Sequence, residues 1–157
     1  MAYVAASGGS VVKNAVSKTA TCGTSKWARA ASIPVINALT AHSRPCQILA
    51  DLYTLWRMGR GLDRLQVAWV GDGNNVAHSL IEAAVLTGIE LRVATPPGCK
   101  PDPGIVARAG RSVKLVEDPR DAVWGAAAVY TDVWVSMGKE ADAENHRLTL
   151  DAYRVSP

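Results

Sequence analysis

The sequence predicts an α/β protein, built as a doubly wound parallel sheet in a Rossmann-like three-layer arrangement, in a single domain with an N-terminal extension. The first observation is an apolar run at Val67–Val70 that meets Gly71-Asp72-Gly73 and is followed by an apolar helix, Val76–Leu86. This order of strand, glycine turn and helix is the first half of a βαβ unit. The second observation is that apolar runs and helix-cap signals alternate from there to the end of the chain. Their spacing predicts parallel crossovers and no antiparallel pairing.

The chain before residue 45 carries weaker signals. Residues 1–24 are small and polar, and they predict either a frayed lead-in or a poorly packed strand. A short helix at Ser25–Ala31 and a short strand at Ile33–Asn37 are expected next. Pro34 favours the start of that strand or a sheet edge, because proline has no N–H to donate to a ladder.

The first strong helix is expected at Cys46–Met58. Its apolar residues fall on one stripe of a 3.6-residue period: Ile48, Leu49, Leu52, Leu55 and Trp56. Pro45 stands just before it, where a first-turn proline costs least, and Gly59 and Gly61 end it.

The remaining elements follow the same logic. The strands of the sheet are expected at Val67–Val70, Leu91–Ala94, Val113–Val116 and Ala128–Tyr130, the last running on through Trp134. Asp102-Pro103 and Asp118-Pro119 each place a capping carboxylate before a first-turn proline, so each predicts the start of a helix. A final helix, polar on one face, is expected at Asp142–Tyr153.

Composition limits the class of function. The 157 residues are 48% hydrophobic and 20% charged, which is typical of a globular domain with its own core. The net charge is +3 with no cluster of Lys and Arg, so nucleic-acid binding has little support. No apolar run has the length of a membrane span, and residues 1–10 lack the features of a secretory signal. The cysteines Cys22, Cys46 and Cys99 form no disulfide or zinc pattern, which favours the cytoplasm.

The candidate site lies where the strand ends meet, at Gly71–Asn75 and Thr131–Gly138. The Asp132 carboxylate and the Ser136 hydroxyl can accept from an α-ammonium group. The Asn75 amide and the free N–H groups of the turn can donate to an α-carboxylate. Together these groups suit a zwitterionic ligand. Taken singly, each has an ordinary alternative: Asp132 as a loop cap, Ser136 as a turn hydroxyl and the asparagine pair as a helix cap.

The histidines and cysteines do not predict a second site. His42, His78 and His146 lack metal-ligand spacing, and His78 is expected to be packed within its apolar helix. Cys46 and Cys99 have no histidine or carboxylate at motif spacing, which argues against a nucleophile. We therefore expect no catalytic side chain, no metal and no cofactor.

Three stretches, in order, resemble the ornithine carbamoyltransferase family. They read P-C-Q-I-L-A-D at Pro45–Asp51, W-V-G-D-G-N-N-V-A-H-S at Trp69–Ser79, and T-D-V-W-V-S-M-G at Thr131–Gly138. The linking stretches Ile33–Thr40 and Ala94–Pro103 are also similar, so the resemblance runs continuously from near Trp27 to the last residue.

The resemblance implies how ornithine is held. Asn75 would bind the α-carboxylate of ornithine, with the backbone N–H of Met137. Asp132 and Ser136 would bind the α-amino group. In the reaction of the family, the δ-amine attacks the carbamoyl carbon of carbamoyl phosphate, phosphate leaves and citrulline forms. The protein would contribute positioning and stabilisation of charge on the reacting groups.

The carbamoyl phosphate side departs from the family. Gln47 would bind the carbamoyl group, but Arg44 replaces the histidine of the His-Pro-Cys-Gln motif that contacts the carbamoyl oxygen. Arginine is longer and always charged, so it donates with a different geometry. The Ser-Thr-Arg-Thr phosphate loop and the His-Cys-Leu-Pro segment of the family are missing. We therefore expect this chain alone to be inactive or nearly so.

The implied organisation has three parts. Residues 1–44 would be an N-terminal extension and remnant of the carbamoyl phosphate domain, 45–61 an interdomain helix, and 62–157 the ornithine-binding α/β domain. With the other half missing, Leu52 and Trp56 are expected to be exposed. An apolar surface around Leu52, Leu55 and Trp56 would favour self-association or binding of a complementing chain.

Three functions stay open at this stage. The chain is an incomplete ornithine carbamoyltransferase, a binding module that holds an amino acid without catalysis, or a degenerate remnant that folds but binds nothing. Citrulline formation from ornithine and carbamoyl phosphate separates the first from the others. Ornithine binding separates the second from the third.

Overall fold

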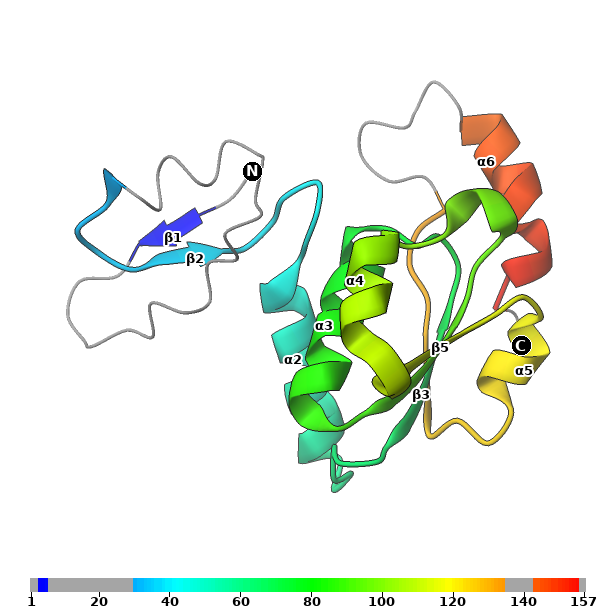
Figure 1. The fold of residues 1–157 in the computed structure, drawn as a ribbon, viewed down its shortest axis with the longest axis horizontal. Coiled ribbons are helices and arrows are strands. Elements are labelled where there is room, and N and C mark those ends of the chain that lie inside the picture. Colours follow the sequence, from blue (N-terminus) through cyan, green and yellow to red (C-terminus); the bar gives the residue numbers. More distant parts are fainter. Residues whose placement is uncertain (1–2, 6–29, 135–142, 156–157) are drawn as a thin grey trace.

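The computed structural model describes residues 3–5, 30–134 and 143–155, and at its centre lies a four-stranded parallel sheet (Figure 1). Its strands, in the spatial order β5-β4-β3-β6, are β3 (Gln66–Val70), β4 (Glu90–Ala94), β5 (Val113–Val116) and β6 (Ala128–Tyr130). Val67 of β3 aligns with Leu91 of β4 on one side and with Ala128 of β6 on the other, in parallel register. The predicted parallel sheet is thus confirmed, with every strand within one residue of its expected start.

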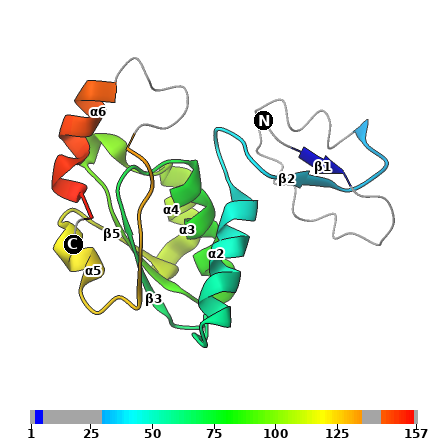
Figure 2. The same cartoon turned by 180° about the vertical axis from the view of Figure 1, so that it is seen from behind.

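Helices cover both faces of the sheet and give three layers (Figures 1 and 2). One face carries α2 (Pro45–Arg57), α3 (Asn75–Thr87) and α4 (Pro103–Ala109), and the other carries α5 (Pro119–Val123) and α6 (Ala143–Leu150). Short 3₁₀ turns extend these elements: η2 (Pro97–Cys99), η3 (Gly110–Ser112) and η5 (Asp151–Tyr153). The final helix therefore continues to Tyr153, as expected, in two pieces.

The central strand β3 is buried on both faces, which explains its unbroken apolar run. Val67 and Trp69 join the core formed with α2, α3 and α4, while Ala68 and Val70 join the core under α5 and α6. Successive side chains of a strand point to opposite faces, so one run of residues supplies both cores.

Side-chain caps start the helices where the sequence places them. The Asp102 carboxylate accepts the backbone N–H groups of Gly104 and Ile105, and Asp118 accepts that of Arg120. Both predicted caps are confirmed. At the end of α3, Gly88 has φ of 77°, a left-handed conformation that closes the helix without a Cβ clash.

Helix α2 divides its apolar stripe between the core and the surface. Ile48 and Leu52 are buried with 2% and 7% exposed, and Leu55 packs against the same core. Leu49 and Trp56, by contrast, are 70% and 57% exposed. The expected exposure of Trp56 is confirmed, but that of Leu52 is wrong. Leu52 lies one turn after Ile48, so both side chains face the core that α2 shares with α3.

The first strands form a separate small sheet (Figure 1). Strand β1 (Tyr3–Ala5) pairs antiparallel with β2 (Val35–Asn37), which occupies the end of the expected Ile33–Asn37 strand. The short helix expected at Ser25–Ala31 lies largely outside the described residues.

Strand β6 ends earlier than predicted. It stops at Tyr130, so the expected continuation through Trp134 is wrong. Beyond it, the Asp132 carboxylate accepts the N–H of Val133 at 2.8 Å, so this N–H is used by a side chain and not by a neighbouring strand. Of the helices in the described part of the chain, none is long and apolar enough to cross a membrane.

Candidate functional site

The order of the strands determines where a ligand can bind. From β3 the chain crosses to β4 and β5 on one side of the sheet, and then returns to place β6 on the other side of β3. Crossovers therefore diverge between β3 and β6. Ligands of open α/β sheets bind outside the carboxyl ends of the strands at this switch point. The segments after these two strand ends are Gly71–Asn75 and the part of the predicted Thr131–Gly138 segment that the structure describes, residues 131–134.

The turn after β3 depends on its glycines. Gly71 has φ of 139°, which an L side chain rarely adopts, and its N–H donates to the Ala94 carbonyl at 3.0 Å. Gly73 donates to the Cys99 carbonyl at 2.7 Å. A Cβ on Gly73 would clash with the backbone nitrogen of Pro101 and lie 2.6 Å from the Cys99 oxygen. The turn therefore packs directly against the 99–101 backbone, and this close approach requires glycine.

Asn74 joins the two halves of the site. Its Oδ1 accepts the N–H groups of Val76 and Ala77 at 2.9 and 3.2 Å, which makes it the cap of α3. Its Nδ2 donates to Asp132 Oδ2 at 2.9 Å. The sequence analysis treated the asparagine pair as a possible cap and did not include Asn74 among the site residues. The doubled asparagine was the only signal, since the partner Asp132 lies 58 residues further along the chain.

The Asp132 carboxylate is held by both of its oxygens. Oδ2 accepts from Asn74, and Oδ1 accepts the backbone N–H of Val133. The side chain is half-buried, at the carboxyl end of β6. Each carboxylate oxygen can accept a further hydrogen bond, so the group can still receive an ammonium ligand. The alternative of Asp132 as a loop cap is also true, and the two roles are compatible.

Asn75 is already engaged by the protein. Its Nδ2 donates to the Thr40 carbonyl at 2.7 Å, and Thr40 is buried with 6% exposed. This bond ties the segment before α2 to the first residue of α3. An amide nitrogen carries two hydrogens, so the bond to Thr40 uses one of them.

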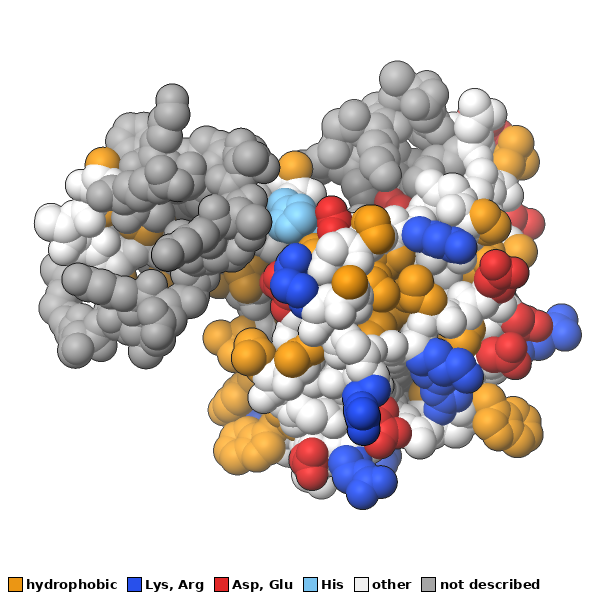
Figure 3. Space-filling model, viewed as in Figure 1, with side chains coloured by type: hydrophobic (Ala, Val, Ile, Leu, Met, Phe, Trp, Pro, Cys, Tyr) orange, Lys and Arg blue, Asp and Glu red, His pale blue; other side chains and the backbone are white. Residues whose placement is uncertain are grey.

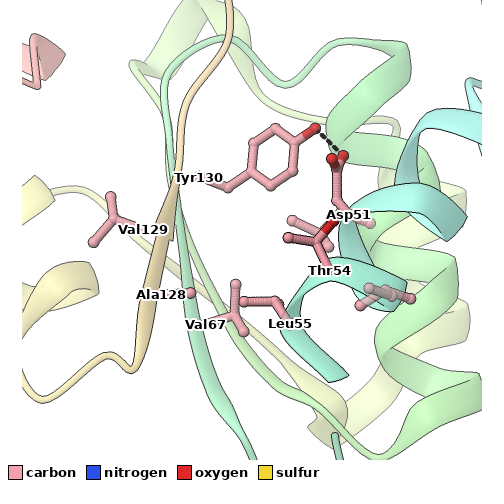
Figure 4. A pocket seen from close by; sticks show the side chains of 9 residues that line it. Asp51, Thr54, Leu55, Val67, Ala128, Val129 and Tyr130 are labelled. Atoms are coloured by element: carbon pink, nitrogen blue, oxygen red, sulfur yellow. Dashed lines mark hydrogen bonds between the residues drawn. The ribbon is translucent and has the colours of Figure 1, made fainter. Parts of the chain in front are cut away.

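The beginning of α2 comes to the same region. The Arg44 backbone N–H donates to Ser79 Oγ of α3 at 2.7 Å. In the first turn of α2, Gln47 Nε2 donates to both oxygens of Asp51, at 3.2 and 3.1 Å. Asp51 in turn accepts the Tyr130 hydroxyl of β6 at 2.5 Å (Figure 4). Gln47 is therefore connected through two side chains to the strand that ends beside Asp132.

Tyr130 is held on its other side as well. Its ring stacks on Trp69 with centroids 5.2 Å apart. Burial and the neighbouring Asp51 carboxylate raise the pKa of Tyr130 well above its ordinary value, so the hydroxyl stays a donor. Beside this contact, a cavity of about 200 Å³ lies between α2 and β6 (Figure 4).

His78 links three segments around the site. Its Nδ1 lies 2.9 Å from the His42 carbonyl oxygen, and its Nε2 accepts the Asp102 N–H at 2.9 Å. Since Nε2 accepts, the proton is on Nδ1 and donates to His42. Burial lowers the pKa of His78, and the hydrogen bond to the His42 carbonyl opposes this lowering only in part. The packed role expected for His78 agrees with these contacts.

Four of the six residues predicted for ligand binding lie in the described part of the chain: Arg44, Gln47, Asn75 and Asp132. Ser136 and Met137 lie outside it. Across residues 3–5, 30–134 and 143–155, no group of three or more His, Cys, Asp or Glu side chains is arranged to hold a metal ion.

Comparison with known families gives two consecutive matches. Residues 63–157 match the Asp/Orn binding domain of aspartate/ornithine carbamoyltransferase, and residues 9–57 match its carbamoyl-P binding domain. The ornithine carbamoyltransferase of Thermus thermophilus is 50% identical over 129 residues, which are 82% of this chain and 42% of that protein. The chain thus spans less than half the length of this relative.

Solved structures show the same fold. The crystal structure of the Thermus thermophilus enzyme superposes with a TM-score of 0.74 at 45% identity, covering 84% of this chain and 42% of that one. Ornithine carbamoyltransferase from Pyrococcus furiosus gives a TM-score of 0.76 at 43% identity, with coverage of 84% and 44%. The chain therefore belongs to the aspartate/ornithine carbamoyltransferase family and resembles its ornithine carbamoyltransferases.

Proposed function

We propose that this chain supplies the ornithine-binding part of an ornithine carbamoyltransferase, which makes citrulline and phosphate from ornithine and carbamoyl phosphate. The observation that carries the proposal is the hydrogen bond between Asn74 and Asp132 at the switch point of the sheet. It places an anchored carboxylate beside the start of a helix, where an amino acid head group needs an acceptor and donors together.

The proposed roles follow from these positions. Asp132 accepts from the α-ammonium group of ornithine, and Ser136 accepts from the same group. Asn75 donates the second hydrogen of its amide to the α-carboxylate, while the first stays on Thr40. The Met137 N–H donates to the same carboxylate. Asn74 orients Asp132 without touching the ligand.

On the carbamoyl phosphate side, Gln47 binds the carbamoyl group, and Arg44 takes the place of the family histidine. Both stand at the beginning of α2, whose Ile48 and Leu52 pack on the ornithine-binding core. We assign residues 1–44 to the carbamoyl phosphate domain, 45–61 to the interdomain helix and 62–157 to the ornithine-binding domain. The matches at 9–57 and 63–157 support a division near residue 60.

Partners and compartment follow from the same reasoning. Self-association or a complementing chain would supply the phosphate contacts that the resemblance leads us to expect and that are missing here. The substrates are small molecules, and neither nucleic acid nor a membrane is a proposed partner. We place the protein in the cytoplasm, because its three cysteines lack the spacing of a disulfide framework.

Ornithine binding measured by calorimetry, with Asp132→Asn, tests the proposal. Asparagine keeps the shape but removes the charge, so affinity should fall about 10- to 100-fold, corresponding to ~1.5–3 kcal/mol for a hydrogen bond between charged groups. Asp121→Asn, on α5 across the sheet, is the matched control and should leave affinity unchanged.

Other results of these binding and activity measurements would favour one of the alternative functions. If Asp132→Asn binds ornithine as tightly as the parent chain, the role of Asp132 is wrong. If the parent chain shows no binding even at millimolar ornithine, the degenerate remnant is the correct description. Binding without citrulline formation, even with a complementing half present, identifies an amino acid-binding module.

A further inference from the structure

The amide of Gln47 has a defined direction. Its Nε2 lies within 3.2 Å of both carboxylate oxygens of Asp51, one helical turn further along α2. A carboxylate only accepts, so the nitrogen of the amide must face Asp51. The carbonyl oxygen, Oε1, then points away from Asp51. Gln47 itself is exposed at the beginning of α2, so Oε1 is accessible to a ligand.

The partner that sets this direction is itself anchored. Asp51 Oδ2 accepts the Tyr130 hydroxyl at 2.5 Å across 79 residues of sequence (Figure 4). Tyr130 is fixed by its stacking on Trp69, which is fully buried in β3. Asp51 therefore cannot swing away as a solvated helix carboxylate would. The chain of contacts from Trp69 to Gln47 turns a surface amide into an oriented group.

We propose that Asp51 and Tyr130 are positioning residues that present Gln47 as a hydrogen-bond acceptor, and so make the site select a carbonyl compound bearing an NH₂ group. This inference rests on the proposed role of Gln47 in binding carbamoyl phosphate. An outward Oε1 accepts from the NH₂ of a carbamoyl group. The CH₃ of the corresponding acetyl group has no hydrogen to donate. With an acetyl ligand, Gln47 Oε1 therefore faces an apolar methyl and is left without a hydrogen-bond partner from the ligand.

Two stable phosphonates test the inference on the full chain. Phosphonoacetamide and 2-oxopropylphosphonate share the phosphonate and the carbonyl, and differ only in NH₂ against CH₃. The ratio of their dissociation constants, measured by ³¹P NMR titration, reports the discrimination. We expect the parent chain to prefer the amide by about 10-fold or more, as for one hydrogen bond of ~1.4 kcal/mol.

Asp51→Asn is the decisive variant. Its new NH₂ can donate to Gln47 Oε1, so the Gln47 amide can turn over and present its nitrogen to the ligand. The preference for phosphonoacetamide should then fall to about 1–3-fold. Tyr130→Phe keeps the ring stacked on Trp69 but removes the hydroxyl, and it should reduce the preference in the same direction. Asp121→Asn is the control and should keep the preference of the parent chain.

A second readout needs no ligand. In the free protein, the side-chain NH₂ signals of Gln47, assigned by their disappearance in Gln47→Met, should move in Asp51→Asn and in Tyr130→Phe but not in Asp121→Asn. If one of these two variants were to unfold, the Gln47 signals in the other would still test the positioning role. Unchanged Gln47 signals in both variants, or an unchanged ligand preference in both, would overturn the positioning role.

Ornithine separates failure of this inference from failure of the proposed function. A parent chain that binds ornithine but shows no preference between the phosphonates, or binds neither, overturns the inference and leaves the ornithine site standing. A parent chain that binds no ornithine overturns the proposed function. In that case the NMR signals of Gln47 still decide whether Asp51 and Tyr130 orient it.

Discussion

At the scale of single residues, this site is built from side chains that each make two contacts. Asn74 caps α3 and also orients Asp132, while His78 donates to one segment and accepts from another. Such side chains are constrained in direction as well as in place, because both of their polar ends are used. A substitution that preserves one contact but not the other should therefore still change the direction of the side chain.

His78 predicts a pH dependence of stability. The neutral ring is required, because Nε2 accepts from Asp102, and the folded chain lowers the pKa of His78 below its ordinary value of 6.5. The contribution of neutral His78 to the free energy of unfolding is therefore fully present above pH 6.5. It is lost as the pH falls through the lowered pKa. His42, Asp102 and Glu82 are the other titratable groups around it, and the two carboxylates oppose the lowering.

Urea unfolding between pH 5 and pH 8 measures this dependence. The free energy of unfolding of the parent chain should decrease below pH 6.5, and His78→Gln, which cannot titrate, should decrease less steeply. His42→Gln tests whether the neighbouring ring accounts for the effect instead. Parallel pH profiles for the parent chain and His78→Gln would show that His78 is not the titrating group.

At the scale of elements, α2 has two apolar faces, and the described part of the chain covers one of them. Ile48 and Leu52 face the core, while Leu49, Tyr53 and Trp56 recur at three- and four-residue spacing on the outer side and are each at least 57% exposed. In Figure 3, hydrophobic side chains gather along the outer edge of the molecule formed by α2. This spacing is typical of a helix that packs against another helix, so we propose the outer face as a surface for association.

Changing the outer face should separate association from stability. Leu49→Gln, Tyr53→Gln and Trp56→Gln together should shift sedimentation toward the monomer, with little change in unfolding free energy, since exposed positions usually contribute within about 0.5 kcal/mol each. Leu52→Ala should leave association unchanged, because Leu52 is buried, and should lower the free energy of unfolding by about 2–5 kcal/mol. A parent chain that sediments strictly as a monomer at high concentration would show that the face does not mediate self-association.

At the scale of the whole molecule, the sheet brings together Asn74 and Asp132 of the proposed ornithine site, yet the chain spans only about 42–44% of the length of two relatives. Asn74 and Asp132 meet because β6 lies beside β3 in this sheet, so we propose that ornithine binding needs no residue from another chain. Catalysis has a larger requirement, because charge on the departing phosphate must also be stabilised.

We therefore predict that the purified chain binds ornithine but forms no detectable citrulline with carbamoyl phosphate. Loss of even one group that stabilises transition-state charge typically costs about 10²–10³ in rate, and several such groups belong to the missing phosphate loop. A colorimetric citrulline assay, with a complete ornithine carbamoyltransferase as the positive control, measures this. Turnover comparable to that of the complete enzyme would contradict the proposed division of the site.

The alternation of strands and helices, the two Asp-Pro caps and the glycine turn at Gly71–Gly73 could all be read from the sequence. They depend on interactions between residues one to four positions apart, or on backbone conformations that few residue types adopt, so the local sequence is sufficient. The positions of Asn75 and Asp132 at strand ends could be predicted for the same reason.

The tertiary structure alone decided which side chains meet. Whether Leu52 or Leu49 is buried depends on where α3 lies relative to α2, and the 3.6-residue period is satisfied by either. The bonds from Asn74 to Asp132 and from Tyr130 to Asp51 span 58 and 79 residues, and they exist because β6 is placed beside β3 by a crossover that skips β4 and β5. Pairing at that distance is set by the order of strands in the sheet, and strand order is a property of the packed chain.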